Sequence, residues 1–423
     1  MRVNKERLEQ LKQNILEGKL QTPAYVLDET MLRSNLEKLK FVADKAGCDI
    51  LLAQKAFSVY QTYPLIGEYL SGATASGLYE AKLGAKYMKK ENHVFSPVYP
   101  KKELEELVTI CDHIIFNSVK DWLRNREDCL RMAENEKKNG RYVSFGLRLN
   151  PCYSTQDHAI YDPCGFGSRF GVRKEVIDSI FQNNPDALDG IDGVHIHTLC
   201  EQNSDDLEAT MEVVERDFAK LLSMVKWINL GGGHHITRED YDVKRLVGVV
   251  KHLKEKYDAK IYLEPGEAVV LDAGYMVADV LDVVENDAKT AILNASAACH
   301  MPDIIEMPYN PNGVVLKKTT SPAGDPEYIW NAHKELVGLE ECGETTYRFG
   351  GNTCLAGDVF GSYVFEQEIN RGDVVVFFDM ALYSLVKNNT FNGMPLPSVL
   401  YMCDDGSIHT IRSFGYEDFE NRL

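Results

Sequence analysis

The chain has 423 residues, with 46 Lys or Arg and 64 Asp or Glu, so its formal net charge is −18. This acidic balance argues against a general nucleic-acid binder, whose affinity comes from Lys and Arg on phosphates. No apolar run reaches the roughly 18 residues of a membrane span, and the polar N-terminal stretch has no apolar signal core, so we expect a cytoplasmic protein.

Short apolar runs alternate with amphipathic helical stretches over most of the chain. Helical periodicity is clear at 102–111, 204–225 and 238–257. Eight runs rich in Val, Ile, Leu or Phe predict buried strands at 49–54, 72–76, 93–97, 113–118, 142–150, 193–199, 226–232 and 260–266. Eight alternating strand and helix units predict a (β/α)8 barrel, and a doubly wound sheet is the alternative.

The pattern changes from about residue 267, where helical periodicity fades and strand-like runs follow one another. These runs predict an antiparallel β domain, and the turn-rich stretch 309–343 predicts an insertion around a short helix. An earlier strand at 24–29 could pair with this β domain. Because one core stops growing at roughly 250–300 residues, we expect two domains. The barrel would cover 30–268, and 1–29 would join 269–423 in the β domain.

The sequence gives little sign of a metal site. The ten cysteines are scattered and none forms a C-x-x-C pair, so we expect reduced thiols and no zinc ribbon. His234 and His235 are adjacent, but adjacent imidazoles rarely share one ion and no ligand cluster accompanies them in the sequence. We therefore predict no bound metal.

Several reactive groups follow the predicted barrel strands, at the end where barrel enzymes carry their active sites. Lys55 follows the first strand, and a lysine there can form a Schiff base. Gly231, Gly232 and Gly233 follow the seventh strand, and their backbone N–H groups can bind phosphate. Glu264 ends the eighth strand and could hold a pyridine nitrogen protonated. Each has an ordinary interpretation alone, but together they meet the needs of pyridoxal phosphate (PLP).

Two histidines lie on the sixth predicted strand, at His195 and His197, and Arg148 lies on the fifth. We expect the two imidazoles to point to opposite faces of their strand, so that at most one reaches a given site.

The chain resembles the fold-type III PLP-dependent decarboxylases, which include ornithine, diaminopimelate and biosynthetic arginine decarboxylases. The resemblance covers 23 to about 410 and implies a barrel with a C-terminal β domain. It is carried by AQKAFS at Lys55, His197, NLGGGH, EPGE at Glu264, C-x-x-x-D at Cys354 and Asp358, and Tyr383. Within this group, HIHTLCEQ, LGGGHH, LEPGEAV and GGNTCLAGDVFG resemble the enzymes that act on carboxynorspermidine and carboxyspermidine.

The resemblance implies a role for each matching residue. Lys55 would hold PLP covalently, His197 would stack on its ring, and Glu264 would pair with the ring nitrogen. Residues expected to contact or lie near the cofactor also include Arg148, Cys200, Gly232, Gly233 and Tyr383. Cys354 would supply the proton that replaces the lost carboxylate. Cys354 and Asp358 would enter the active site of a neighbouring subunit, which implies a homodimer.

Two departures bear on the phosphate and the substrate. Relatives often have Arg where this chain has Glu267, and a phosphate-binding Ser where it has Cys200. Either the phosphate depends on the loop Gly231–Gly233, called the glycine loop, or Glu267 faces the substrate. The expected substrate is a small polyamine precursor, and the residues predicted to bind it are Glu267, His300, Asp303, Glu306 and Asp358. The alternatives are a diaminopimelate, ornithine or arginine decarboxylase, or a non-catalytic homologue. The presence of Lys55 and Cys354 argues against the last.

Overall fold

The computed structural model describes residues 4–156, 161–320, 325–338 and 343–423. The chain divides into two compact units. One unit is Ser34–Val269, and the other combines Met1–Arg33 with Val270–Leu423.

The first unit contains a closed barrel of eight parallel strands, which confirms the predicted fold and excludes a doubly wound sheet. Its strands are β2 (Asp49–Ala53), β3 (Gly72–Ala75), β4 (Glu91–Phe95), β5 (His113–Phe116), β6 (Ser144–Leu149), β7 (Ile191–Ile196), β8 (Trp227–Asn229) and β9 (Lys260–Leu263). The barrel closes where Asp49 of β2 pairs with Tyr262 of β9.

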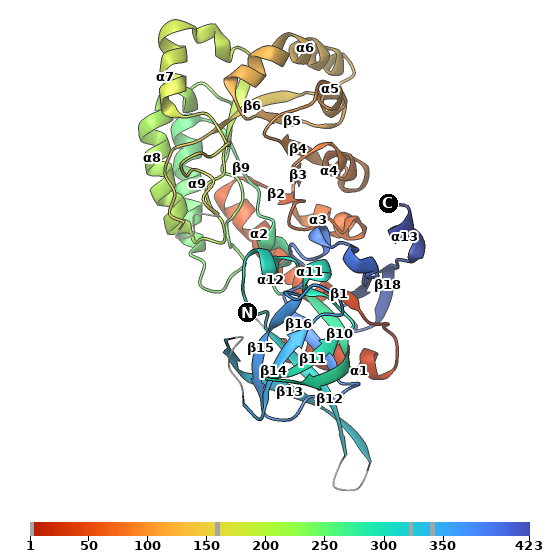
Figure 1. Cartoon of the computed structure of the whole chain (residues 1–423). Helices are drawn as coiled ribbons and strands as arrows, with labels where there is room; N and C mark the ends of the chain where they lie inside the picture. Colours follow the sequence, from red (N-terminus) through yellow and green to blue (C-terminus); the bar gives the residue numbers. More distant parts are fainter. Residues whose placement is uncertain (1–3, 157–160, 321–324, 339–342) are drawn as a thin grey trace. The chain divides into compact units, whose positions relative to one another are not determined.

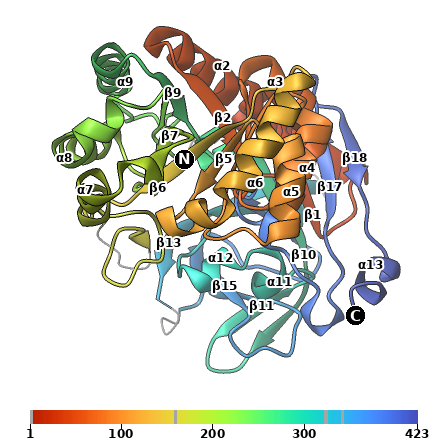
Figure 2. The ribbon, with the colours of Figure 1, turned by 90° about the horizontal axis from the view of Figure 1, so that it is seen from above.

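Helices connect these strands on the outside of the barrel, as Figures 1 and 2 show for α5 to α9. The helices are α2 (Glu29–Ala46), α3 (Tyr63–Tyr69), α4 (Leu78–Leu83), α5 (Lys101–Ile110), α6 (Val119–Lys138), α7 (Lys174–Asn183), α8 (Ser204–Leu222), α9 (Val243–Tyr257) and α10 (Glu267–Val270). Short turns of helix lie at Tyr60–Thr62, Gly84–Met88 and Pro185–Leu188. The predicted helices at 102–111, 204–225 and 238–257 correspond to α5, α8 and α9.

The barrel interior holds Trp227 together with Leu51, Ile115 and Tyr262, and two glycines make room for the Trp227 ring. Trp227 is buried and its Nε1 donates to Ser144 Oγ at 2.8 Å. A Cβ at Gly193 would lie 1.9 Å from the Trp227 ring, and one at Gly146 would lie 2.2 Å from it. These two positions on β6 and β7 therefore have to be glycine to accommodate the indole.

The second unit contains a ten-stranded, mostly antiparallel sheet in the order β11-β14-β15-β13-β12-β16-β10-β1-β17-β18, which confirms the predicted β domain (Figure 1). Its strands are β1 (Ala24–Asp28), β10 (Gly274–Glu285), β11 (Lys289–Leu293), β12 (Gly313–Thr320), β13 (Pro326–Val337), β14 (Thr346–Gly350), β15 (Val359–Phe365), β16 (Val374–Phe378), β17 (Ser398–Met402) and β18 (Ile408–Arg412). The early strand, β1, pairs with β10 and β17 as expected.

The core of this unit joins both ends of the chain. It includes Leu8 and Leu11 of α1 (Lys5–Leu16), packed with buried residues of β1, β10, β16 and β17. Arg7 is buried beside Asp28, with Nε 3.0 Å from the carboxylate, and its Nη2 donates to the carbonyl of Met402. The ion pair and the apolar contacts hold α1 to β1 and β17.

The expected short helix within 309–343 is wrong for the described part of that stretch. The structure has β12 and β13 there, paired antiparallel with Val314 opposite Ala332. Val and Thr residues in β12 and Tyr, Ile and Trp residues in β13 favour strands, and the Pro, Gly and Thr residues around them concealed this pattern. The sequence also did not predict the short helices α11 (Ala297–His300), α12 (Asp303–Glu306) and α13 (Tyr416–Glu420), or the turns Leu385–Lys387 and Phe391–Gly393.

Among the described residues, no helix has the length and apolar character needed to cross a bilayer.

Candidate active site

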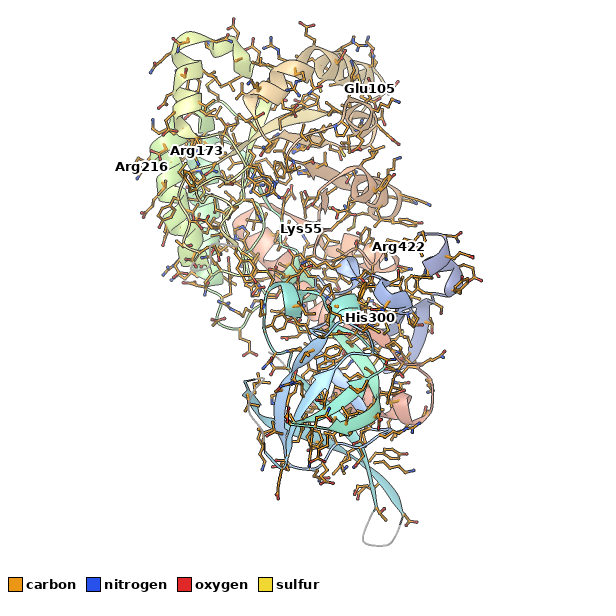
Figure 3. The ribbon with its side chains drawn as sticks, in the orientation of Figure 1. Lys55, Glu105, Arg173, Arg216, His300 and Arg422 are labelled. Carbon is orange, nitrogen blue, oxygen red and sulfur yellow. The ribbon has the colours of Figure 1, made fainter. Side chains whose placement is uncertain are left out.

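Lys55 lies in the turn after β2, and its side chain is exposed (Figure 3). The loop after β9 packs directly against this turn. The N–H of Ala53 donates to the carbonyl of Pro265 at 3.2 Å. A Cβ at Gly266 would lie 2.6 Å from that of Ala56, so only glycine permits this approach. Lys55 and Glu264 are thus carried by two loops that are fixed to each other.

The Glu264 carboxylate is buried and receives two hydrogen bonds. His195 Nε2 lies 3.1 Å from Oε2, and Asn229 Nδ2 donates to Oε1 at 2.7 Å. Burial by itself would raise the pKa of Glu264, but the His195 imidazole and the Asn229 amide outweigh it and lower the pKa to about 2. Glu264 is therefore ionised at neutral pH. A group that accepts a hydrogen bond from a protonated ring nitrogen needs this negative charge.

The glycine loop after β8 is bonded to the backbone of Glu264 and to the side chain of Asn229. The N–H of Glu264 donates to the carbonyl of Gly231 at 2.7 Å. The N–H of Gly231 donates to Asn229 Oδ1 at 2.9 Å. Gly231 has φ +70°, and a Cβ there would lie 2.6 Å from the carbonyl oxygen of Ile196. The loop needs glycine at this position for both conformation and space.

His197 is a neutral imidazole held by the same loop. Its Nδ1 accepts from the N–H of Gly232 at 2.8 Å, which leaves the ring proton on Nε2. Burial first, and then the charge of Lys55, hold its pKa well below the usual range. Arg148 Nη2 donates to the carbonyl of His197 at 3.0 Å, and its guanidinium lies 4.5 Å from the ring centres of Phe95 and Phe170. Arg148 thereby fixes the backbone that carries the imidazole.

The expectation that His195 and His197 point to opposite faces is wrong. Their rings are stacked, with centroids 6.1 Å apart and planes within 6°. Side chains alternate along a strand, so residues two apart point to the same face. Both imidazoles therefore belong to one site, with His195 beside Glu264 and His197 beside the glycine loop.

The predicted phosphate contacts are not all available in the structure as it stands. The N–H of Gly232 is used by His197. Gly233 has φ +80°, and a Cβ there would lie 2.1 Å from the carbonyl oxygen of Leu199. Cys200 is half-buried, and its carbonyl accepts from Gln156 Nε2 at 2.8 Å. Phosphate contacts by Cys200, Gly232 and Gly233 stay predictions.

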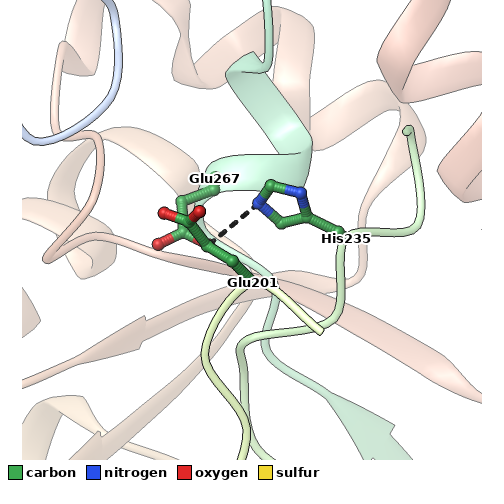
Figure 4. Close-up of side chains that lie close together, drawn as sticks. All are labelled: Glu201, His235 and Glu267. Atoms are coloured by element: carbon green, nitrogen blue, oxygen red, sulfur yellow. Dashed lines mark ion pairs between the residues drawn. The ribbon is translucent and has the colours of Figure 1, made fainter. Parts of the chain in front are cut away.

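Glu267, the first residue of α10, is buried next to His235. Its Oε2 lies 3.4 Å from His235 Nε2, and Glu201 joins them so that one ligand atom of each lies within 4.8 Å of the others. Figure 4 shows the three side chains, which follow the adjacent strands β7, β8 and β9. The sequence analysis found no such group around His235 because its members come from three separate loops.

In the β unit, the loop between β14 and β15 presents Cys354. This thiol is exposed, whereas Asp358 is buried. Asp358 Oδ1 accepts from Ser296 Oγ at 3.0 Å and from the N–H of Ala298 at 3.1 Å, and Oδ2 accepts from Thr353 Oγ1 at 2.6 Å. Asp358 therefore stabilises the loop that carries Cys354, and both of its oxygens already accept hydrogen bonds.

The remaining predicted residues of the β unit also have partners. His300 is fully buried, with Nδ1 accepting from the N–H of Ser296 and Nε2 3.2 Å from the carbonyl of Pro395; burial lowers its pKa to about 4. Asp303 and Glu306 both pair with Lys387. Tyr383 has φ +50°, and the Lys387 ammonium lies 5.8 Å from its ring centre.

The barrel residues fit PLP. A buried carboxylate with a lowered pKa suits a pyridinium nitrogen. At Gly232 a Cβ would lie 2.6 Å from the carbonyl oxygen of Glu264 and 3.2 Å from His197 Cε1, so a side chain there would fill the space between these two groups. Sequence reasoning named Lys55, His197 and Glu264 as candidates and did not name Asn229. The available signal was a polar residue in a predicted buried strand, two positions before the glycine triplet.

Comparisons with known proteins also indicate a PLP-dependent decarboxylase. A family model described as "Pyridoxal-dependent decarboxylase, C-terminal sheet domain" matches residues 24–381. A carboxynorspermidine/carboxyspermidine decarboxylase of Campylobacter jejuni is 40% identical, covering 96% of this chain and 99% of that protein. A carboxyaminopropylagmatine decarboxylase of Synechocystis is 35% identical, covering 97% and 98%. A crystal structure of carboxynorspermidine decarboxylase with norspermidine, from Campylobacter jejuni, superposes with a TM-score of 0.80 at 38% identity, covering 96% of this chain and 100% of that chain.

Proposed function

The chain belongs to the family of pyridoxal-dependent decarboxylases, and we propose that it converts carboxynorspermidine to norspermidine and carboxyspermidine to spermidine. The observation that carries this proposal is the 40% identity over nearly the full length of a relative with that name. The arrangement of Lys55, His197, Glu264 and the glycine loop at one end of the barrel supports the same chemistry.

PLP, when bound, supplies the electron sink that accepts the electrons of the bond to the departing carboxylate. Lys55 Nζ would attach the cofactor and give way to the α-amine of the substrate. Glu264 would accept a hydrogen bond from the protonated ring nitrogen, and its low pKa keeps it ionised for this purpose at any pH above about 4. The neutral imidazole of His197 would lie against the ring face.

Cys354 would complete the reaction by giving a proton from Sγ to the carbon that has lost CO₂, and solvent would then restore the thiol. We propose that the enzyme is cytoplasmic. We also propose that the thiol reaches the site of a neighbouring subunit in a homodimer. Mixing Lys55→Ala with Cys354→Ala protein tests this arrangement. Random subunit exchange would form mixed dimers with one intact site each and restore about a quarter of wild-type activity. A mixture that stays inactive after verified exchange would place Cys354 elsewhere.

The distal ammonium groups of the substrate need carboxylates, because charge-assisted hydrogen bonds are about twice as strong as neutral ones. Glu267, which lies beside His235, is our first candidate because it is at the same end of the barrel as Glu264. Asp303, Glu306, Asp358 and His300 are weaker candidates, because they lie in the β unit and have partners there. Glu267→Gln should raise KM strongly. A change within about twofold would exclude Glu267 as the amine site.

The substrate is tested by measuring CO₂ release and identifying the amine product by mass spectrometry. The panel contains carboxynorspermidine, carboxyspermidine, carboxyaminopropylagmatine, meso-diaminopimelate, ornithine and arginine. Turnover of the first two is expected. Preferential turnover of carboxyaminopropylagmatine would favour the second candidate, which the 35% identity to the Synechocystis enzyme supports. Bound PLP without turnover of any substrate would favour a non-catalytic homologue.

A further inference from the structure

Asn229 is a fully buried side chain that the reaction outlined above does not use. It is the last residue of β8, two residues before the glycine loop begins to turn at Gly231. Its Nδ2 donates to Glu264 Oε1 at 2.7 Å, and its Oδ1 accepts from the N–H of Gly231 at 2.9 Å. One amide therefore joins the carboxylate expected to hold the ring nitrogen to the loop expected to hold the phosphate.

A carboxamide suits this position better than other side chains. It carries a donor and an acceptor on one short fork without a net charge. Asp would keep the acceptor for Gly231 but would place a second negative charge against Glu264, and like charges raise the pKa of one partner. Ala would leave the N–H of Gly231 and one lone pair of Glu264 without partners in a buried place, which is costly.

The connection extends to both sides of Asn229. Beyond Gly231, the N–H of Gly232 donates to His197 Nδ1, and a further backbone bond runs from Glu264 to the carbonyl of Gly231. A side chain at position 231 would lie 2.6 Å from the carbonyl oxygen of Ile196 and 2.7 Å from Cβ of His197, so the loop packs closely against the end of β7. Movement of the loop would thus disturb the carboxylate and the imidazole together.

We propose that Asn229 is a positioning residue that couples Glu264 to the glycine loop, so that the contacts to the ring nitrogen and to the phosphate of PLP form as one unit. This inference rests on the proposed roles of Glu264 and the loop. It predicts that losing either contact weakens the other, which a residue with a purely structural role would not do.

The first test is a double-mutant cycle read by the Kd of the apo-protein for PLP, measured by fluorescence titration. The variants are Asn229→Ala, Glu264→Gln and the pair. Glu264→Gln should weaken PLP binding by about tenfold in the wild-type background and by less than about twofold in Asn229→Ala. The two effects would then be strongly non-additive.

Asn150 offers a matched control for this cycle. It follows β6 at the same end of the barrel, is 2% exposed, and also uses both ends of its amide, donating to the carbonyl of Phe170 and accepting from the N–H of Cys152. Its side-chain hydrogen bonds go to Phe170 and Cys152 and not to Glu264 or the glycine loop. Asn150→Ala should therefore combine additively with Glu264→Gln.

The second test uses the isosteric Asn229→Asp, which keeps the acceptor for Gly231 and so remains useful if the alanine variant does not fold. Its added carboxylate should raise the pKa of Glu264. The acid-side change in the absorbance of bound PLP should then move to higher pH by about one unit or more, and Asn150→Asp should leave it unmoved.

Additive effects of Asn229→Ala and Glu264→Gln, or an Asn229→Asp profile equal to wild type, would overturn the coupling. Neither readout needs a substrate. A wild-type protein that binds PLP and shows the coupling but does not decarboxylate a triamine would therefore refute only the proposed substrate. A wild-type protein that does not bind PLP would refute the site itself.

Discussion

The two units carry the predicted site residues in different ways. In the barrel unit, Glu264 bonds directly to His195 and Asn229, and His197 bonds to Gly232 of the glycine loop. In the β unit, the buried residues support a loop, and the reactive group, Cys354, is exposed at its tip. The barrel groups are therefore held in place by bonds within their own unit, whereas Cys354 is exposed and its chemistry depends on the groups that come to lie beside its thiol.

The largest expected effect comes from removing the group that attaches the cofactor. Lys55→Ala should lower kcat by at least about 10⁴-fold, because no other residue can replace a covalent amine. Steady-state CO₂ release measures the loss. Lys102→Ala, an exposed lysine at the start of α5, is the control and should stay within about twofold of wild type. Comparable activity in both variants would remove Lys55 from the mechanism.

Cys354→Ala should have the second largest effect, a decrease in kcat of about 10²- to 10³-fold, because a general acid contributes within that range. PLP binding should be retained, since the barrel groups that hold the cofactor are unchanged. Absorbance titration with PLP and CO₂ release give the two measurements. Cys403→Ala, also in the β unit, is the matched control. A Cys354→Ala variant with full kcat would show that the proton comes from another group.

His300 should affect stability rather than chemistry, and mainly in acid. Its pKa is lowered to about 4 in the folded protein. Between pH 6.5 and 4, His300 is therefore protonated in the unfolded chain but not in the folded chain. The native state should lose on the order of 3 kcal/mol over this window, and stability should be regained as pH rises through 6.5. His300→Gln should flatten this dependence in urea unfolding at pH 7 and pH 5.

The exposed His409 on β18 is the control for that comparison. His409→Gln should leave the pH dependence of the unfolding midpoint as in wild type. If His300→Gln raised KM more than tenfold while the acid dependence stayed unchanged, His300 would be a substrate contact instead.

The smallest expected effect is at α12. Asp303→Asn should change KM by no more than about threefold, because its partner Lys387 already balances the charge and the pair is partly exposed. Initial-rate kinetics with carboxynorspermidine measure it. A rise in KM above about tenfold would identify Asp303 as an amine-binding residue and displace Glu267 from that role.

Much of the barrel could be predicted because its strands are buried apolar runs that alternate along the chain with amphipathic helices. Lys55, His197 and Glu264 could be placed at one end for the same reason, since parallel strands in a barrel end at a common rim. Strand periodicity also predicts that His195 and His197 share a face, and the opposite expectation misread that periodicity.

Other features depend on contacts between distant segments. The pairing of Glu267 with His235 and Glu201 joins three loops, and nothing in the spacing of these residues along the chain indicates it. Asn229 was missed for a similar reason, because its amide donates to Glu264, a residue that follows a different strand, β9. The β12–β13 pair was missed because its strand-forming residues lie among turn residues and are recognised as strands only when paired with each other.

The most direct test of the central claim is the ratio of kcat/KM for carboxynorspermidine to that for meso-diaminopimelate, measured on the same PLP-loaded protein. The proposed function predicts a ratio of at least about 100, because a site built for ammonium groups leaves the distal carboxylate of diaminopimelate without a partner. A ratio of one or less would contradict it, while leaving the fold and the cofactor in place.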